Sequence, residues 1–361
     1  MAKKKRKLSR KARRRRRRKI FLIVEIIVLL LLLLFLFAWL KLGLINFTDL
    51  TNFAQNNLDA ESREMLSGYT NIACFGVDNR SNGDYDTGNS DSIIIVSINN
   101  DSKEVKLMSV YRDTAMDVDG EGTIRKCNYA YNHGGAKEAV DMLNRNLDLN
   151  IDKYVAVDFY ALVDAIDAVG GVTIEVSPQE AAIMNQSYID YTSEITGVKS
   201  SHVEAGTQTL DGVQAVSYCR VRYTAGGDFM RASRQRIVLQ ALVNKVKDAS
   251  PAQLNKLVEA VFPNISTNIK LSTMLSLATA MSDYTIASSS GFPFALTTGT
   301  YGSKGSLDIP CTLASNVTEE YKYLFGEDHT PSETVQDISD SIEKFSGKDE
   351  SDAVDYSQYV Q

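Results

Sequence analysis

Arginine side chains gather in one short segment of the chain, which points to a site for an anion. Residues 42–361 contain ten Arg, and five of them fall in 220–236. The same part of the chain has 24 basic and 44 acidic residues, so a basic cluster there suggests a multiply charged anionic ligand. The planar fork of Arg matches phosphate oxygens. Ordinary ion pairs between these arginines and the many acids are the alternative.

Two predicted elements would aim this cluster at one place. Side chains two apart on a strand predicted over 215–221 leave the same face. Side chains three and four apart on a helix predicted from about 229 to 247 also share a face. The groups concerned are Arg220 and Arg222 on the strand, and Arg231, Arg234 and Gln235 on the helix. Asp228 lies at the start of the helix, where it could pair with them.

Two aspartates flank a polar loop between the first predicted strands. Asp78 ends one strand and Asp91 opens the next. Carboxylates that converge at strand ends can hold a hard cation such as Mg²⁺, which often bridges to substrate phosphates; aspartates that only fill turns are the alternative. Arg112 follows the third predicted strand, where functional groups gather in open α/β sheets, and Lys126 comes soon after.

Familiar catalytic motifs are missing from the sequence. The chain has three His and lacks the Gly-x-Ser-x-Gly, His-Glu-x-x-His and P-loop patterns. A serine hydrolase, a zinc protease and an ATPase are therefore poorly supported. The four cysteines form no Cys-x-x-Cys pair, so they do not make a zinc site, and disulfides and free buried thiols remain equally open.

The amino-terminal part predicts a membrane anchor. Residues 1–19 hold 14 basic residues and no acid, and 20–41 form an apolar run long enough to cross a bilayer. The run is longer than the core of a cleaved signal peptide and lacks small residues at its end. The basic flank predicts a cytoplasmic amino terminus and an extracellular remainder, with lipid as partner. Nucleic acid is not expected as a partner of the acidic remainder.

The remainder predicts an α/β domain. Apolar, β-branched runs at 71–77, 92–98 and 105–110 predict strands, and further strands alternate with amphipathic helices up to about residue 260. This alternation favours a three-layer α-β-α architecture. We expect a stalk over 42–67, a catalytic domain over 68–330 and an acidic, disordered tail over 331–361.

Five ordered motifs resemble the LytR-CpsA-Psr family of cell-envelope ligases over roughly 70–247. They are Phe75-Gly76-Val77-Asp78-Asn79-Arg80 with Ser90-Asp91-Ser92-Ile93, Ser109-Val110-Tyr111-Arg112-Asp113-Thr114, Lys126-Cys127-Asn128-Tyr129-Ala130-Tyr131, the segment from Phe159 to Gly170-Gly171-Val172, and the segment from Leu210-Asp211-Gly212 to Gln235. The resemblance implies a three-layer domain with a mixed central sheet. It also implies transfer of a glycopolymer from a polyprenyl-pyrophosphate carrier to peptidoglycan through a phosphodiester bond.

The resemblance further implies a role for each site residue. Asp78 and Asp91 would bind Mg²⁺ on the pyrophosphate. The catalytic set would be Arg112, Asp228 and Arg231, with Asp228 orienting the arginines. The pyrophosphate-binding set would be Arg80, Lys126, Arg220, Arg222, Arg234 and Gln235.

The sequence departs from the family pattern at two positions. Asn89 stands where an Arg is expected two residues before Asp91, and Tyr111 stands where Pro commonly precedes Arg112. Arg80 could substitute for the missing guanidinium. Two other functions use the same site: hydrolysis of the lipid-linked saccharide, with water as acceptor, and a non-enzymatic scaffold that binds polyprenyl phosphates. The identity of the polymer, whether teichoic acid, capsule or another wall polysaccharide, is not encoded in these motifs.

Overall fold

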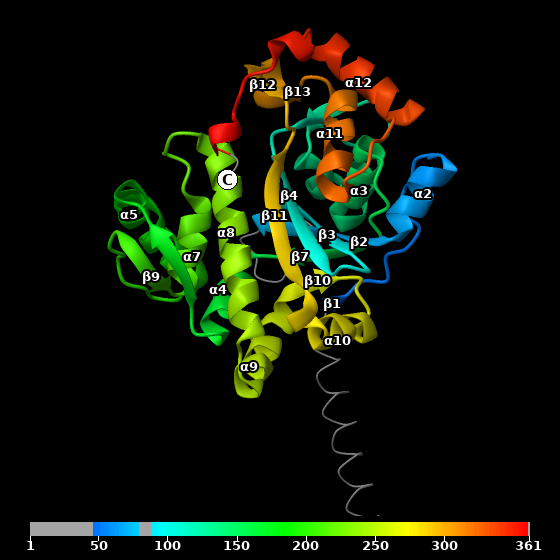
Figure 1. Cartoon of the computed structure of the whole chain (residues 1–361). Coiled ribbons are helices and arrows are strands. Elements are labelled where there is room, and N and C mark those ends of the chain that lie inside the picture. The colour runs from blue at the N-terminus through cyan, green and yellow to red at the C-terminus, as the bar shows by residue number, and fades with distance from the viewer. Residues whose placement is uncertain (1–45, 79–84, 86–87, 360–361) are drawn as a thin grey trace, which may run out of the picture. The chain divides into compact units, whose positions relative to one another are not determined.

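A seven-stranded mixed sheet forms the centre of the molecule (Figure 1). The computed structural model describes residues 46–78, 85 and 88–359. In spatial order the strands are β1 (Asn46–Phe47), β10 (Ile265–Thr267), β7 (Lys153–Val157), β2 (Tyr69–Asp78), β3 (Asn89–Asn99), β4 (Glu104–Val110) and β11 (Thr285–Phe292). The β2/β3, β3/β4 and β10/β7 pairs are antiparallel, and the β1/β10, β2/β7 and β4/β11 pairs are parallel. The predicted α/β fold with a mixed central sheet is thus confirmed.

Successive side chains of the sheet point to opposite cores, as the two-residue period of a strand requires. On β2, Ala73 and Phe75 belong to one core and Ile72 belongs to the other. The first core is completed by residues of α2 (Ala60–Ser67), α3 (Tyr129–Leu147), α11 (Leu313–Phe325) and α12 (Glu333–Ser346). The second core is completed by residues from α8 (Gly227–Lys247), α10 (Leu271–Thr279) and their neighbours. These two helical layers enclose the sheet.

A smaller lobe with its own core packs beside α8 (Figure 1). Its elements are α4 (Phe159–Ala168), β8 (Val172–Val176), α5 (Pro178–Ile183), η1 (Met184–Tyr188), α6 (Ile189–Thr196), β9 (Gly206–Leu210), α7 (Gly212–Arg220) and α9 (Pro251–Val261). The β8/β9 pair is a separate two-stranded sheet, as are β5 (Ala115–Asp117) with β6 (Ile124–Lys126) and β12 (Leu296–Thr300) with β13 (Ser306–Pro310). The lobe brings α4 and α7 to the same side of the central sheet as α8.

The strand predicted over 215–221 is wrong, because these residues belong mostly to helix α7. Asp211 accepts a hydrogen bond from the backbone N–H of Gln214, whose side chain accepts one in return from the backbone of Asp211. This capping box starts the helix, and it outweighs the β-branched residues that suggested a strand. Arg220 is therefore the last residue of a helix, and Arg222 follows it in a loop.

Residues on either side of the domain expected over 68–330 also take part in the fold. The predicted stalk contributes β1, which pairs with β10, and the buried Leu58 and Leu66. The predicted disordered tail contains α12, whose Val335, Ile338 and Ile342 are buried in the first core. Their spacing of three and four residues places them on one helix face, with the acids on the other. The acidic composition therefore describes an exposed face of a folded helix.

The predicted span at 20–41 lies outside the described residues, as does the basic tail before it. Among the helices that the structure describes, none is long and apolar enough to cross a membrane. All four cysteines are free thiols, and Cys127, Cys219 and Cys311 are buried. Burial raises the pKa of Cys219 to about 12, so this thiol is inert at neutral pH.

Candidate active site

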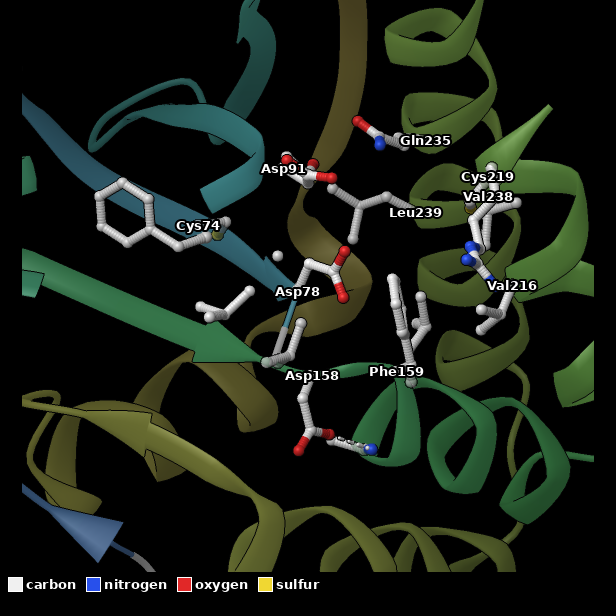
Figure 2. A pocket seen from close by; sticks show the side chains of 18 of the residues that line it. Cys74, Asp78, Asp91, Asp158, Phe159, Val216, Cys219, Gln235, Val238 and Leu239 are labelled. Atoms are coloured by element: carbon white, nitrogen blue, oxygen red, sulfur yellow. Dashed lines mark hydrogen bonds between the residues drawn. The ribbon is translucent and has the colours of Figure 1, made fainter. Parts of the chain in front are cut away.

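A cavity of about 420 Å³ opens between the end of β2, the start of β3 and helices α4, α7 and α8. Its inner wall is apolar and includes Phe75, Ile94, Leu162, Val238 and Leu239. Charged and polar side chains gather elsewhere on the same lining: Asp78, Asp91, Arg220, Arg222, Arg231 and Gln235. Figure 2 shows the side chains of Asp78, Phe159 and Leu239 directed into the same space. The cavity thus combines an apolar interior with an ionic rim.

The two metal candidates, Asp78 and Asp91, reach this cavity through the geometry of one hairpin. Asp78 ends β2 and pairs with Asn89 of β3. The register then shifts between Gly76 and Val77, so Asp91 lies in a β-bulge opposite them. A bulge re-aims the side chain of its extra residue and often occurs beside active sites. Asp78 and Asp91 both line the cavity, as expected for carboxylates at neighbouring strand ends.

Helix α8 supplies one wall of the cavity through a single stripe of residues. Arg231, Gln235 and Leu239 are four residues apart and all line it. At 3.6 residues per turn such positions lie one above another on the same face. The stripe therefore runs from an ionic group at its start to an apolar group at its end. Gln235, predicted to bind phosphate, lies at the boundary between the two.

Asp228 binds three arginines at the rim of the cavity. Its Oδ1 lies 3.0 Å from Nη2 of Arg231, 3.5 Å from Nε of Arg222 and 3.7 Å from Nε of Arg112. The predicted role of Asp228 in orienting the arginines agrees with this geometry. Arg231 is almost fully buried. Its burial, which Asp228 opposes and the nearby Arg112 and Arg222 reinforce, lowers its pKa to about 10.

Arg112 is held by acids on several sides. Its Nη1 donates to Oδ1 of Asp91 at 2.8 Å, and its Nε lies 3.7 Å from Oδ1 of Asp113 and of Asp228. Burial alone lowers the pKa of Arg112, but the three carboxylates outweigh it and raise the pKa. Arg112 therefore stays charged. Its Nε has no hydrogen-bond partner within the described part of the chain, and the same holds for Nη2 of Arg222 and Nε of Arg231. These buried N–H donors suit an anionic ligand.

Arg220 reaches the cavity from the end of α7 and is held by aromatic rings. Its guanidinium lies 4.9 Å from the ring centroids of Phe159 and Tyr191 and 5.8 Å from that of Tyr188. Its Nη1 also donates to Oγ1 of Thr192 at 3.1 Å. Burial lowers the pKa of Arg220, although Asp78 acts in the opposite direction. Stacking fixes the guanidinium plane beside the cavity.

Arg234 does not line the cavity, although the sequence placed it with the phosphate-binding residues. The residue is buried, and its Nε donates to Oε1 of Glu180 at 2.7 Å. Its Nη1 donates to the carbonyl of Val221 and its Nη2 to Oγ1 of Thr224. Arg234 thus occupies the other side of α8, where it holds the loop that carries Arg222. Its predicted contact with phosphate is corrected to a positioning role.

The remaining predicted residues fall outside this cavity. Lys126 lines a neighbouring cavity and places its Nζ 3.0 Å from Oδ1 of Asp113. Arg80 lies outside the described residues. Tyr111, which replaces the expected Pro, is buried and packs edge-on against Phe229 at 4.7 Å between ring centroids. Asn89, which replaces the expected Arg, lines the neighbouring cavity.

One acid beside the site was missed by the sequence analysis. Asp308 of β13 is buried, and its backbone N–H donates to the carbonyl of Asp113 at 2.9 Å. Burial, Asp113 and Asp228 raise the pKa of Asp308 to about 7, while Lys126 and Arg112 act in the opposite direction. No local pattern in the sequence marks this residue, because these neighbours in space come from three distant segments.

The described residues contain no cluster of three His, Cys, Asp or Glu side chains that could hold a metal alone. Asp78 and Asp91 nevertheless fit Mg²⁺ as a pair, because that ion is commonly bound by one or two carboxylates together with substrate phosphates and water. Both carboxylates line the rim beside the unpartnered guanidinium donors. The two carboxylates and the guanidinium N–H groups therefore suit Mg²⁺ bound together with a phosphate ligand better than Mg²⁺ bound by the protein alone.

The fold and the site together define an α/β protein whose apolar cavity carries arginines and aspartates at its rim. The sequence profile of the LytR_cpsA_psr family matches residues 47–295, and the chain belongs to this family.

Relatives agree with that placement. The chain is 32% identical over 248 residues to the polyisoprenyl-teichoic acid–peptidoglycan teichoic acid transferase TagV of Bacillus subtilis, covering 66% of this chain and 60% of that protein. It is 32% identical over 209 residues to the corresponding TagU of Enterococcus faecalis, covering 57% and 64%. The alignments thus span less than two thirds of these curated relatives.

Solved structures share the fold over a larger part of the chain. A crystal structure of a Streptococcus agalactiae protein superposes with a TM-score of 0.61 at 26% identity, covering 83% of this chain and 96% of that one. The crystal structure of TagV from B. subtilis superposes with a TM-score of 0.56 at 25% identity, covering 78% and 98%. The three-layer architecture is therefore that of the family.

Proposed function

We propose that this protein is a phosphotransferase that moves a glycopolymer from a polyprenyl-pyrophosphate carrier to peptidoglycan. The observation that carries the proposal is that one cavity combines an apolar interior with a rim of arginines and aspartates. A lipid pyrophosphate likewise joins an apolar chain to a charged phosphate group. Relatives named as teichoic acid transferases support the same reaction. The glycopolymer is a teichoic acid, a capsule or another wall polysaccharide.

The carrier binds with its lipid chain against Leu162, Val238 and Leu239 and its phosphates at the rim. Arg112, Arg222 and Arg231 then donate to the phosphate oxygens with N–H groups that have no other acceptor. Asp228 holds these three guanidinium groups in place before the substrate arrives. Pre-positioned donors stabilise charge that develops during phosphoryl transfer without having to reorganise.

The transfer exchanges one phosphorus–oxygen bond for another. A hydroxyl oxygen of the peptidoglycan acceptor attacks the phosphorus that carries the glycopolymer. The bond from that phosphorus to the lipid phosphate breaks, and polyprenyl phosphate leaves. Mg²⁺ held by Asp78 and Asp91 would supply positive charge to the pyrophosphate oxygens. The arginines stabilise the charge on the equatorial oxygens of the same phosphorus.

We further propose that residues 20–41 anchor the protein in the cell membrane, with 1–19 cytoplasmic and the catalytic domain outside. The support is the block of 14 basic residues before an apolar run of membrane-spanning length. This topology puts the cavity where lipid-linked saccharides and peptidoglycan meet. Cysteine labelling at engineered sites in 1–19 and in α12 would test it, since only the latter should react in intact cells.

The test of the reaction uses the full chain in detergent with Mg²⁺, a polyprenyl-pyrophosphate disaccharide and peptidoglycan fragments, followed by mass spectrometry. A saccharide phosphate joined to the glycan, with free polyprenyl phosphate, is expected. The Arg112→Ala variant should fold but lose transfer by about a hundredfold or more. Chelation with EDTA should abolish transfer, and full activity after chelation would remove the proposed role of Asp78 and Asp91.

Two other outcomes would replace the proposal. Free polyprenyl phosphate without a joined product in any acceptor would indicate a hydrolase that uses water. Tight lipid binding without turnover would indicate a non-enzymatic scaffold.

Transfer by a folded Arg112→Ala variant at the wild-type rate would remove that residue from the mechanism. Arg63→Ala, an exposed change on α2, serves as the matched control.

A further inference from the structure

A second cavity, of about 320 Å³, lies next to the lipid-sized one and shares no lining residue with it. Its walls come from the residues after β4, from β6, from the start of α3 and from the turn η4 (Gly302–Lys304) between β12 and β13. The charged and aromatic members of its lining are Arg112, Asp113, Arg125, Lys126, Tyr129 and Lys304. The family resemblance implies roles at the phosphates for Arg112 and Lys126, but it implies no role for Arg125, Tyr129 or Lys304.

The charge of this second cavity calls for an anion. Four of its lining residues are basic and one is acidic, whereas the chain from residue 42 onward is strongly acidic. Asp113 already pairs with Lys126, and Arg112 pairs with Asp91. Arg125 and Lys304 have no ion-pair partner within the described ranges. Among the described residues, two charges at one cavity are thus left for a ligand.

The two uncompensated groups are held in place by neutral neighbours. The guanidinium of Arg125 lies 4.2 Å from the ring centroid of Tyr129, and that ring stacks in turn on His133. Nζ of Lys304 donates to the carbonyl of Ile124 at 2.6 Å and lies 4.5 Å from the ring centroid of Phe345. Such contacts orient a cation without neutralising it. Both cations therefore stay available to a ligand's negative charge.

The Arg112–Asp91 ion pair separates the two cavities, since Asp91 lines the first and Arg112 lines the second. In phosphoryl transfer the attacking and leaving oxygens lie roughly in line on opposite sides of the phosphorus. If the lipid phosphate leaves toward the apolar cavity, the attacking hydroxyl must approach from the other side of the bound phosphate. The second cavity, which lies across the Arg112–Asp91 pair from the first, is the space that this approach would use.

We propose that the second cavity is the acceptor subsite and that it binds a carboxylate-bearing glycan through Arg125 and Lys304. The inference rests on the proposed function and adds to it the place and the charge of the acceptor. Peptidoglycan strands carry the carboxylates of their stem peptides beside their sugar hydroxyls, which matches a cavity with two cations that have no ion-pair partner among the described residues. The proton that the attacking hydroxyl releases passes to Asp113, the acid in this lining. The new bond joins the acceptor oxygen to the glycopolymer phosphorus as the lipid phosphate departs.

The test measures the KM values of donor and acceptor separately in the full chain. Arg125→Gln and Lys304→Gln should each raise the KM for a peptidoglycan fragment about tenfold, because each removes one charge-assisted contact. The KM for the lipid-linked donor should stay within about twofold. The charge-keeping variant Lys304→Arg should retain most of the acceptor affinity. Lys256→Gln on α9, an exposed lysine that lines neither cavity, is the matched control.

A second acceptor tests whether charge is what the cavity recognises. The double variant combines Arg125→Gln with Lys304→Gln. A fragment whose carboxylates are amidated should bind the wild-type chain weakly, with an affinity close to that of the native fragment for the double variant. A raised KM for the donor with an unchanged KM for the acceptor would overturn the proposal and assign the cavity to the glycopolymer. Unchanged kinetics in the double variant would overturn it as well.

Failure of the proposed function can be told apart from failure of this inference. A wild-type chain that turns over no donor would refute the transferase. Calorimetric titration with the peptidoglycan fragment needs no turnover and would still decide the subsite. Binding to the wild type that disappears in the double variant supports an anionic-glycan site, and equal binding to both overturns it.

Discussion

The buried ion pair between Arg234 and Glu180 offers the sharpest test of the architecture, because its geometry separates a structural role from phosphate binding. Arg234 donates three hydrogen bonds, to Glu180 Oε1, the Val221 carbonyl and Thr224 Oγ1. Both charged side chains are at least nine-tenths buried. The change Arg234→Met keeps most of the side-chain volume and removes the charge, so it leaves Glu180 buried without its partner.

The expected loss of stability follows from that burial. Exposed ion pairs contribute about 0–1 kcal/mol, whereas removing one member of a buried pair costs about 3–5 kcal/mol. Arg234→Met should therefore lower the free energy of unfolding by about 3–5 kcal/mol. The double change Arg234→Met with Glu180→Leu should lower it by less than Arg234→Met alone, because no stranded carboxylate remains.

The pair should also respond to acid. Burial by itself raises the pKa of Glu180, but hydrogen bonds from the backbone of Ser177 and from Arg234 outweigh it and leave the pKa below the ordinary 4.5. A depressed folded-state pKa contributes stability above the unfolded-state pKa and loses it as pH falls through the folded-state value. The wild type should therefore lose this contribution below about pH 4.5, and Arg234→Met should lose less over the same range.

Urea denaturation followed by circular dichroism and tyrosine fluorescence provides the assay, because the one tryptophan, Trp39, lies in the proposed membrane anchor. Arg63→Met is the exposed control. Phosphate binding by Arg234 would predict the opposite pattern: little loss of stability and a large rise in donor KM. A loss below about 1 kcal/mol would refute the reasoning, since that is the range of an exposed pair.

Two further predictions concern the apolar cavity and the buried acid near it. Leu239→Trp should fill part of the lipid cavity and raise the KM about tenfold for a long-chain carrier but much less for a short-chain one; equal effects on both carriers would contradict the assignment. Asp308 has a pKa raised to about 7, so its protonated form contributes stability that is lost as pH rises from about 4 to 7. Asp308→Asn should flatten that loss in urea titrations across this pH range, and an unchanged slope would show that Asp308 does not titrate there.

The sequence predicted most accurately what depends on short-range pattern. The strands at 71–77, 92–98 and 105–110 follow from apolar, β-branched runs, and the helix expected from about 229 to 247 corresponds to α8. The strand predicted over 215–221 is wrong because a capping box stabilises a helix there in spite of the β-branched residues. The disordered tail predicted over 331–361 is wrong because the prediction relied on the acidic composition as a whole. The few apolar residues of this segment are spaced so that they share one face of a helix.

The site was predictable in part for the same reason. Asp78, Asp91 and Arg112 lie at or just beyond strand ends, and ends of adjacent strands are close in any sheet. Glu180 and Asp308 were not predictable, since each meets its partners only through tertiary packing of distant segments. Arg234 shares a helix with Arg231, yet it faces the smaller lobe, and no spacing rule tells which side of α8 the lobe covers.

The balance of charge at the rim explains why the site would need a cation with its substrate. At and beside the rim the described residues place five basic groups, Arg112, Lys126, Arg220, Arg222 and Arg231, and five aspartates, Asp78, Asp91, Asp113, Asp158 and Asp228. Without the aspartates, guanidinium groups this close would repel one another, and burial already lowers the pKa of Arg231. The aspartates therefore allow the arginines to lie close together, and as a result the rim has no net charge. The proposed pyrophosphate would bring negative charge that the rim does not neutralise, and the proposed divalent cation at Asp78 and Asp91 would restore the balance.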